Sequence, residues 1–156
     1  MRFTASLLAL ASVAYAQING TNGIGSTPSE RYVVSADQAC QIIQAGVKNA
    51  TAIGVPQNIA VVDPSGLLVA FLRMDNAYIG SIDISQKKAK TAVVFNGLSS
   101  AGLYNASQPV FGGGLPIYYK GKLIGGVGVS GGTVPQDVEV ATAALAGIGA
   151  SATAPM

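Results

Sequence analysis

A single lysine, Lys88, is the residue of this chain whose position most suggests chemistry. In a helix expected from Ser81 to Phe95, apolar side chains gather on one half of a helical wheel, and Lys88 falls inside that half. Lys87 and Lys90 fall on the polar half, as ordinary solvated charges do. Two interpretations of Lys88 stay open. Its stem could run along the core so that the amine reaches water, or its ammonium could line a pocket, paired with a carboxylate or bound to an anionic ligand.

Three further charged residues are candidates for the same site. Arg73 ends a predicted strand, and its planar guanidinium suits a carboxylate because it offers two parallel hydrogen bonds. The alternative for Arg73 is an internal ion pair with Asp75 or another acid. Asp137 opens the last predicted helix, where negative charge suits the helix dipole, and it could also face Lys88.

A run of three glycines precedes Leu115. Such a run permits positive φ and close backbone approach, and its successive N–H groups could form an anion-binding nest or a lid. A plain loop, or tight packing against a neighbouring subunit, is equally consistent with it. The predicted ligand-binding residues are Lys88, Arg73, Asp75, Gly112, Gly113, Gly114 and Asp137.

The chain contains no histidine. This removes the commonest general base near neutral pH and the commonest metal ligand, so zinc sites of the usual kinds and Ser-His-Asp or Cys-His arrangements are excluded. The segment Gly126–Gly132 matches both a nucleophile-elbow pattern around Ser130 and a dinucleotide fingerprint. We reject both, because the first lacks its histidine and the glycines of the second lie inside a predicted strand. No metal site is predicted.

The elements expected to position these residues alternate hairpins with helices. Ser35 caps a helix to about Thr51, and a capping box at Thr133 and Gln136 opens the last helix, to about Ala146. The single cysteine, Cys40, falls on the apolar stripe of the first helix and is expected to be a buried thiol. The remaining predicted elements are a first hairpin Ile59–Asp63 and Leu67–Met74 turned at Asp63–Gly66, a short helical piece Leu98–Tyr104, a second hairpin Leu115–Tyr119 and Leu123–Ser130 turned at Lys120-Gly121, and a short strand or extended lead-in at Arg31–Val34.

The first 16 residues have the pattern of a secretory signal peptide. Arg2 precedes the apolar run Phe3–Val13, and Ala14-Tyr15-Ala16 supplies the small-x-small cleavage pattern. We therefore expect a secreted, extracellular protein with a flexible arm at 17–30, one α+β domain at 31–150 and a short tail at 151–156.

Charged residues make up only 10% of the chain, against roughly 25% in an ordinary globular protein. Burial of surface in a homo-oligomer would compensate for this, and so would glycan. Sequons at Asn19, Asn49 and Asn105 make glycosylation plausible. Because the few basic residues form no patch, neither nucleic acid nor a membrane surface is an expected partner.

Together these pieces resemble the GlcG/HbpS-like (haem-degrading-domain) family, over roughly residues 35–147 in consistent order. The residues that carry the resemblance are Ile59–Asp63 with Gly66 and Arg73-Met74-Asp75, then Ser81–Ile84 with Lys88-Ala89 and Thr91-Ala92, and finally Gly113–Ile117, Gly125–Gly131 and Gln136-Asp137. The resemblance implies a profilin-like α+β fold with a central antiparallel sheet of about five strands flanked by helices, assembly into oligomers, and in some members haem binding. This chain departs from it in one respect. Without histidine, haem iron would need Met74, Tyr78, Lys88 or a hydroxyl as its ligand, or would bind without one.

Three functions stay open at this point. The favoured one is a secreted protein that binds an anionic small molecule or a haem-type tetrapyrrole in a pocket near Lys88. The second is an enzyme acting on a small organic acid, with Lys88 as base or Schiff-base amine, Arg73 as carboxylate clamp, and Asp75 or Asp137 as proton partner. The third is a glycosylated structural or interaction protein without a small-molecule site.

Overall fold

The computed structural model describes residues 32–95, 99–103 and 112–154. These residues form one antiparallel sheet of four strands with three α-helices and one 3-10 turn, an α+β fold. In chain order the elements are α2 (Ala36–Ala52), β1 (Asn58–Val62), β2 (Leu68–Arg73), α3 (Ser81–Val94), η2 (Ser100–Leu103), β3 (Gly114–Tyr119), β4 (Lys122–Ser130) and α4 (Val134–Ala146).

Two hairpins joined side by side make the sheet, with strand order β2-β1-β4-β3. In the first turn, the Asp63 carboxylate accepts hydrogen bonds from the N–H groups of Ser65 and Leu67, at 2.8 and 2.9 Å. In the second turn, Lys120 and Gly121 both have positive φ, 49° and 79°, as a two-residue hairpin turn requires. Both predicted hairpins are thereby confirmed.

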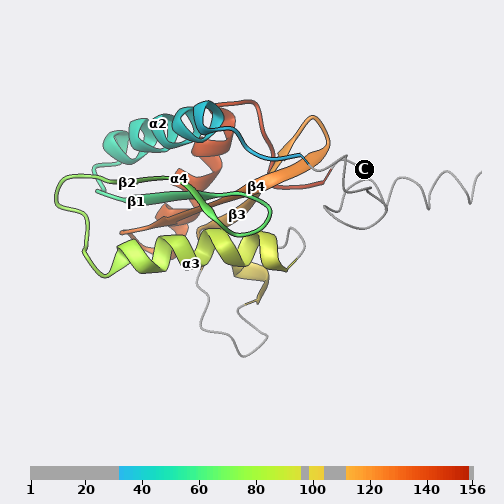
Figure 1. Ribbon diagram of the computed structural model, residues 1–156. Helices are drawn as coiled ribbons and strands as arrows, with labels where there is room; N and C mark the ends of the chain where they lie inside the picture. The colour runs from blue at the N-terminus through green and yellow to red at the C-terminus, as the bar shows by residue number, and fades with distance from the viewer. Residues whose placement is uncertain (1–31, 96–98, 104–111, 155–156) are drawn as a thin grey trace, which may run out of the picture.

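Helices cover the sheet on both faces (Figure 1), with α2 and α4 on one face and α3 on the other. The larger core lies under α2 and α4 and is built of branched aliphatic side chains such as Ile42, Ile59, Val127 and Val129. The smaller core lies under α3 and contains only Ala60, Val62, Ala89 and Val93 among its buried members. The two faces therefore differ in side-chain size.

The small residues of β4 explain how α3 comes so near the sheet. Side chains alternate across a strand, so Gly126, Gly128 and Ser130 share the face toward α3 while Val127 and Val129 point the other way. A Cβ on Gly128 would collide with the carbonyl oxygen of Ser85 in α3, and one on Gly126 would lie 2.5 Å from that of Ala89. The helix thus rests backbone against backbone on the strand.

The described sheet has four strands, so the fifth strand expected at Arg31–Val34 is not confirmed. Arg31 lies outside the described residues, and residues 32–34 are irregular. The N–H of Val34 donates one backbone hydrogen bond, to Ile124 O at 2.8 Å. The capping box that starts α2 follows directly, with Ser35 and Gln38 exchanging side-chain-to-backbone hydrogen bonds at 3.0 and 3.1 Å.

Cys40 is exposed, so the expectation of a buried core thiol is wrong. The buried stripe of α2 runs through Ala39, Ile42, Ile43, Gly46 and Ala50, and Cys40 lies just outside it. The short helical piece is a 3-10 turn at Ser100–Leu103; the predicted ends at Leu98 and Tyr104 lie outside the described residues. In the part of the chain that the structure describes, no helix is both long and apolar enough to cross a membrane.

Candidate functional site

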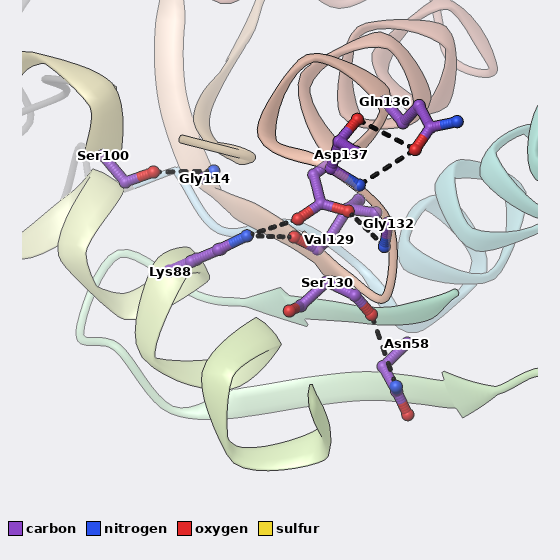
Figure 2. Close-up of polar contacts among 10 residues, drawn as sticks. Asn58, Lys88, Ser100, Gly114, Val129, Ser130, Gly132, Gln136 and Asp137 are labelled. Carbon is purple, nitrogen blue, oxygen red and sulfur yellow. Dashed lines mark hydrogen bonds and ion pairs between the residues drawn. The ribbon is translucent and has the colours of Figure 1, made fainter. Parts of the chain in front are cut away.

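Lys88 is buried, with 3% of its surface exposed, and it is ion-paired. Its Nζ lies 2.7 Å from Asp137 Oδ2 and donates a second hydrogen bond to Val129 O at 2.9 Å. Figure 2 shows the lysine extending from α3 toward Asp137 at the start of α4. The prediction that Lys88 belongs to the apolar half of its helix is confirmed, while the alternative of an amine that reaches water is wrong.

The first turn of α4 fixes the position of Asp137. Gln136 Oε1 accepts a hydrogen bond from Thr133 N–H at 2.9 Å, as in the predicted capping box. Asp137, the next residue, is 3% exposed, and its Oδ1 accepts a hydrogen bond from Gly132 N–H at 2.9 Å. Each oxygen of this buried carboxylate therefore has a donor, which a desolvated charge requires.

The glycine run packs against this ion pair. Gly113 has φ +109°, and a Cβ there would lie 2.8 Å from Asp137 Cβ and 3.1 Å from Lys88 Nζ. Gly114 N–H donates to Ser100 Oγ at 2.8 Å, so it is not free to bind an anion. All three glycines, Gly112 included, are buried. This geometry supports close packing around Lys88 and does not support an open nest or a surface lid at these positions.

An open hollow of about 280 Å³ lies beside the ion pair. Its lining comes from the loop before α3, from α3 itself, and from the segment between β4 and α4: Tyr78, Ser81, Ile84, Lys88, Ser130, Gly131, Gly132, Val134 and Asp137. Three lining side chains are apolar and exposed, namely Tyr78 at 72%, Ile84 at 39% and Val134 at 42%. The hollow thus has a charged, buried floor and an apolar, accessible rim.

Asn58 ties two walls of the hollow together. It is fully buried in β1, and its Nδ2 donates to Tyr78 O at 3.0 Å and to Ser130 O at 3.3 Å. Tyr78 belongs to the loop before α3 and Ser130 ends β4, so this amide connects the rim of the hollow to its floor. Figure 2 shows the contact of Asn58 with Ser130.

The structure brings together some of the predicted site residues and separates others. Lys88, Asp137 and the glycine run are neighbours. Arg73 and Asp75 are exposed and do not line the hollow. Arg73 Nη1 donates to Ala77 O at 3.4 Å, and within the described residues it has no ion pair with Asp75.

Of the three sequon asparagines, one lies among the described residues. Asn49 lies inside α2 and is half-buried, and its Oδ1 lacks a hydrogen-bond partner. Asn19 and Asn105 lie outside the described residues. Across the residues that the structure describes, no group of three or more His, Cys, Asp or Glu side chains could hold a metal ion.

Several residues of the hollow were missed by sequence reasoning, in particular Ser81, Ser130 and Val134. One signal was available: the alternation Gly126, Gly128, Ser130 along β4 places Ser130 on the face toward α3. From the sequence, Ser130 was considered only as the serine of a rejected nucleophile-elbow pattern, and this face was overlooked.

Comparison with known proteins gives a consistent result. The model of the family described as "Haem degrading protein HbpS-like" matches residues 34–146. An uncharacterised 15.0 kDa protein from the dhaT-dhaS intergenic region of Citrobacter freundii is 43% identical over 122 residues, which cover 69% of this chain and 86% of that protein. Protein GlcG of Escherichia coli (strain K12) is 37% identical over 115 residues, covering 64% and 83%.

Two further similarities concern PduO. The corrinoid adenosyltransferase PduO of Citrobacter freundii is 34% identical over 131 residues; they cover 74% of this chain but only 39% of PduO. The crystal structure of a PduOC–haem complex superposes with a TM-score of 0.71 at 32% identity, covering 77% of this chain and 98% of that one.

Proposed function

Because this chain belongs to the HbpS-like family, we propose that it is a small-ligand-binding protein that takes a haem-type tetrapyrrole at the hollow beside Lys88. The observation that carries the proposal is the exposed apolar rim of Tyr78, Ile84 and Val134 around a polar floor. A tetrapyrrole is a flat apolar ring with polar arms, and such a rim offers its ring a surface to cover. The solved haem complex of the similar PduOC chain supports the same ligand class.

The size of the hollow restricts how such a ligand could bind. Pockets that enclose a drug-sized molecule span roughly 300–1,000 Å³, and this hollow has about 280 Å³. A tetrapyrrole would therefore lie over the rim, with only one edge or arm inside.

Among the residues considered as ligands of haem iron, Tyr78 fits best. Met74 Sδ already accepts a hydrogen bond from Gln57 N–H at 3.4 Å, and its side chain packs against the larger core. The Lys88 ammonium is held by Asp137 and has no lone pair to offer a metal. Tyr78 lines the hollow and is 72% exposed, and tyrosine oxygen is a known ligand of haem iron. A bound haem would supply the redox chemistry of its iron.

A haemin titration of the full chain, followed at the Soret band, tests this function. We expect a saturable shift at one haemin per chain and, in Tyr78→Phe, loss of the tyrosinate-to-iron signature. Protoporphyrin IX, which has no iron, should bind the wild type and Tyr78→Phe equally. Tyr32→Phe is the matched control, because Tyr32 is also exposed (48%) but does not line the hollow. A titration without saturation would refute tetrapyrrole binding.

An enzyme that uses Lys88 on a small organic acid is the second candidate, and the geometry favours it less. The lysine is engaged as an ammonium, which cannot attack a carbonyl, and Arg73 does not lie at the hollow to act as carboxylate clamp. If borohydride trapped a keto acid covalently on Lys88, the result would support this enzymatic function.

Secretion is part of the proposal and rests on the signal-peptide pattern before Gln17. N-terminal sequencing of protein recovered from the culture medium should begin at Gln17. An intracellular product that retains Met1 would contradict secretion.

We also propose a homo-oligomer, supported by the low charge content and by exposed leucines at the edge of the sheet. Leu68 and Leu72 of the edge strand β2 are 50% and 36% exposed, Leu67 in the turn before it is 66% exposed, and an apolar edge strand invites a partner. Light scattering should give a multiple of the chain mass. The variant Leu68→Lys should lower that mass, and a monomeric wild type would rule the oligomer out.

A further inference from the structure

The hollow contains hydrogen-bonding groups that the protein itself leaves unused. An ammonium has three N–H donors, and Lys88 uses two of them, for Val129 O and Asp137 Oδ2. Ser81 and Ser130 are 8% and 5% exposed and line the hollow. Within the described part of the chain neither hydroxyl makes a hydrogen bond. Three donors from largely buried residues thus line the same hollow.

The charges at this place do not repel an anion. Lys88 and Asp137 cancel each other, and both oxygens of Asp137 are already engaged, by Lys88 and by Gly132 N–H. The first turn of α4, at Val134, adds the partial positive charge of a helix N-terminus. An incoming acceptor therefore meets donors and a weakly positive field.

We infer that the hollow is a binding site for one carboxylate group, held by the third N–H of Lys88 and the hydroxyls of Ser81 and Ser130. A carboxylate accepts about four hydrogen bonds through its two oxygens, so it can take all three donors. The apolar remainder of the ligand lies against Tyr78 and Ile84. This inference deepens the proposed function, since it concerns the same hollow.

Two sources could supply the carboxylate. One is a propionate arm of a tetrapyrrole whose ring covers the rim; the other is a free carboxylic acid of a few carbons. The volume of about 280 Å³ suits either an arm or a small acid, and both use the same three donors.

The experiment compares three probes on the full chain: haemin, haemin dimethyl ester, whose propionates cannot ionise, and sodium butyrate. For a propionate source we expect the ester to bind the wild type at least tenfold more weakly than haemin. For a free acid we expect millimolar butyrate to shift the amide NMR signals of Ser81, Gly131 and Gly132.

The double variant Ser81→Ala/Ser130→Ala keeps the buried ion pair intact and is therefore expected to fold, as circular dichroism would show. It should bind haemin or butyrate about tenfold more weakly and leave ester binding unchanged. The matched control is Ser65→Ala in the exposed β1–β2 turn, which should change nothing.

The outcomes separate this inference from the proposed function. If haemin and its ester bind equally and butyrate shifts no signal, the carboxylate site is refuted while tetrapyrrole binding stands. If butyrate binds and haemin does not, the carboxylate site stands and the tetrapyrrole fails. If none of the three probes binds, both fail.

Discussion

Replacing Lys88 by methionine removes the ammonium and keeps most of the side-chain volume, so it isolates the charge. The variant leaves Asp137 with 4% of its side chain exposed and without its counter-ion. Breaking a buried ion pair in this way costs about 3–5 kcal/mol of unfolding free energy, because a desolvated charge is left uncompensated. For a domain of this size that corresponds to a fall in melting temperature of roughly 10–20 °C.

A double-mutant cycle tests the reason for this loss. Lys88→Met/Asp137→Leu removes both charges, and replacing both partners of a buried pair by apolar side chains is often nearly neutral. Gly132 N–H loses its acceptor in the double variant, so recovery is incomplete. We expect the double variant to be more stable than Lys88→Met, with a coupling energy of at least about 2 kcal/mol. Urea unfolding followed by circular dichroism measures all four corners of the cycle.

Lys87 provides the matched control in the same helix. It pairs with Asp83 at 2.6 Å, but the two side chains are 73% and 69% exposed, and such surface pairs contribute about 0–1 kcal/mol. Lys87→Met should therefore unfold close to the wild type. If Lys88→Met were equally harmless, the desolvated pair would be refuted, and with it the charged floor of the hollow.

Three further predictions follow from single residues. Gly128→Ala should lower the free energy of unfolding by about 3 kcal/mol or prevent folding, because its Cβ would meet Ser85 O. Its control is Gly80→Ala, which should be neutral or slightly stabilising, because no atom lies within 4 Å of the new Cβ and φ is −61°. Urea unfolding compares the two variants. Burial raises the pKa of the Tyr118 hydroxyl above 10.0, so the unfolded chain releases this proton at a lower pH than the folded one. The free energy of unfolding should therefore fall as pH rises beyond about 10. In Tyr118→Phe, the melting temperature should fall less over the same pH range. Native Cys40 should react with Ellman's reagent as fast as in denatured protein, and a slow reaction would contradict its exposure.

Local signals in the sequence predicted the elements well where side chains act on their own backbone. The capping pairs Ser35–Gln38 and Thr133–Gln136 define the starts of α2 and α4. The turn residues of both hairpins lie where the sequence placed them, because these positions require particular backbone angles. Local signals do not decide between a strand and an extended lead-in at Arg31–Val34, because strand formation depends on pairing with a neighbouring strand.

Helical periodicity was informative for Lys88 and misleading for Cys40. The lysine lies well inside the apolar half of its wheel, so a small error in phase does not change the result. The cysteine lies at the border of its stripe, where one position decides between core and solvent. Periodicity therefore predicts the centre of a buried face better than its edges.

The sequence predicted only some of the residues that form the site. Asp137 lies 49 residues from Lys88, and their contact depends on how α3 and α4 flank the same end of β4. Arg73 ends the opening hairpin and Asp75 follows it, as expected, yet nothing local to a strand end determines whether such side chains turn toward a pocket or toward solvent. The hollow itself arises from three separate segments, which no local pattern connects.

The contact of α3 with the glycines of β4 has a consequence for engineering. The height of this helix above the sheet is determined by main-chain atoms at Gly126 and Gly128, not by interlocking side chains. Positions 81, 84 and 134 can therefore be randomised to select new ligands while the framework keeps its shape. The glycines themselves are the positions that a library should leave unchanged.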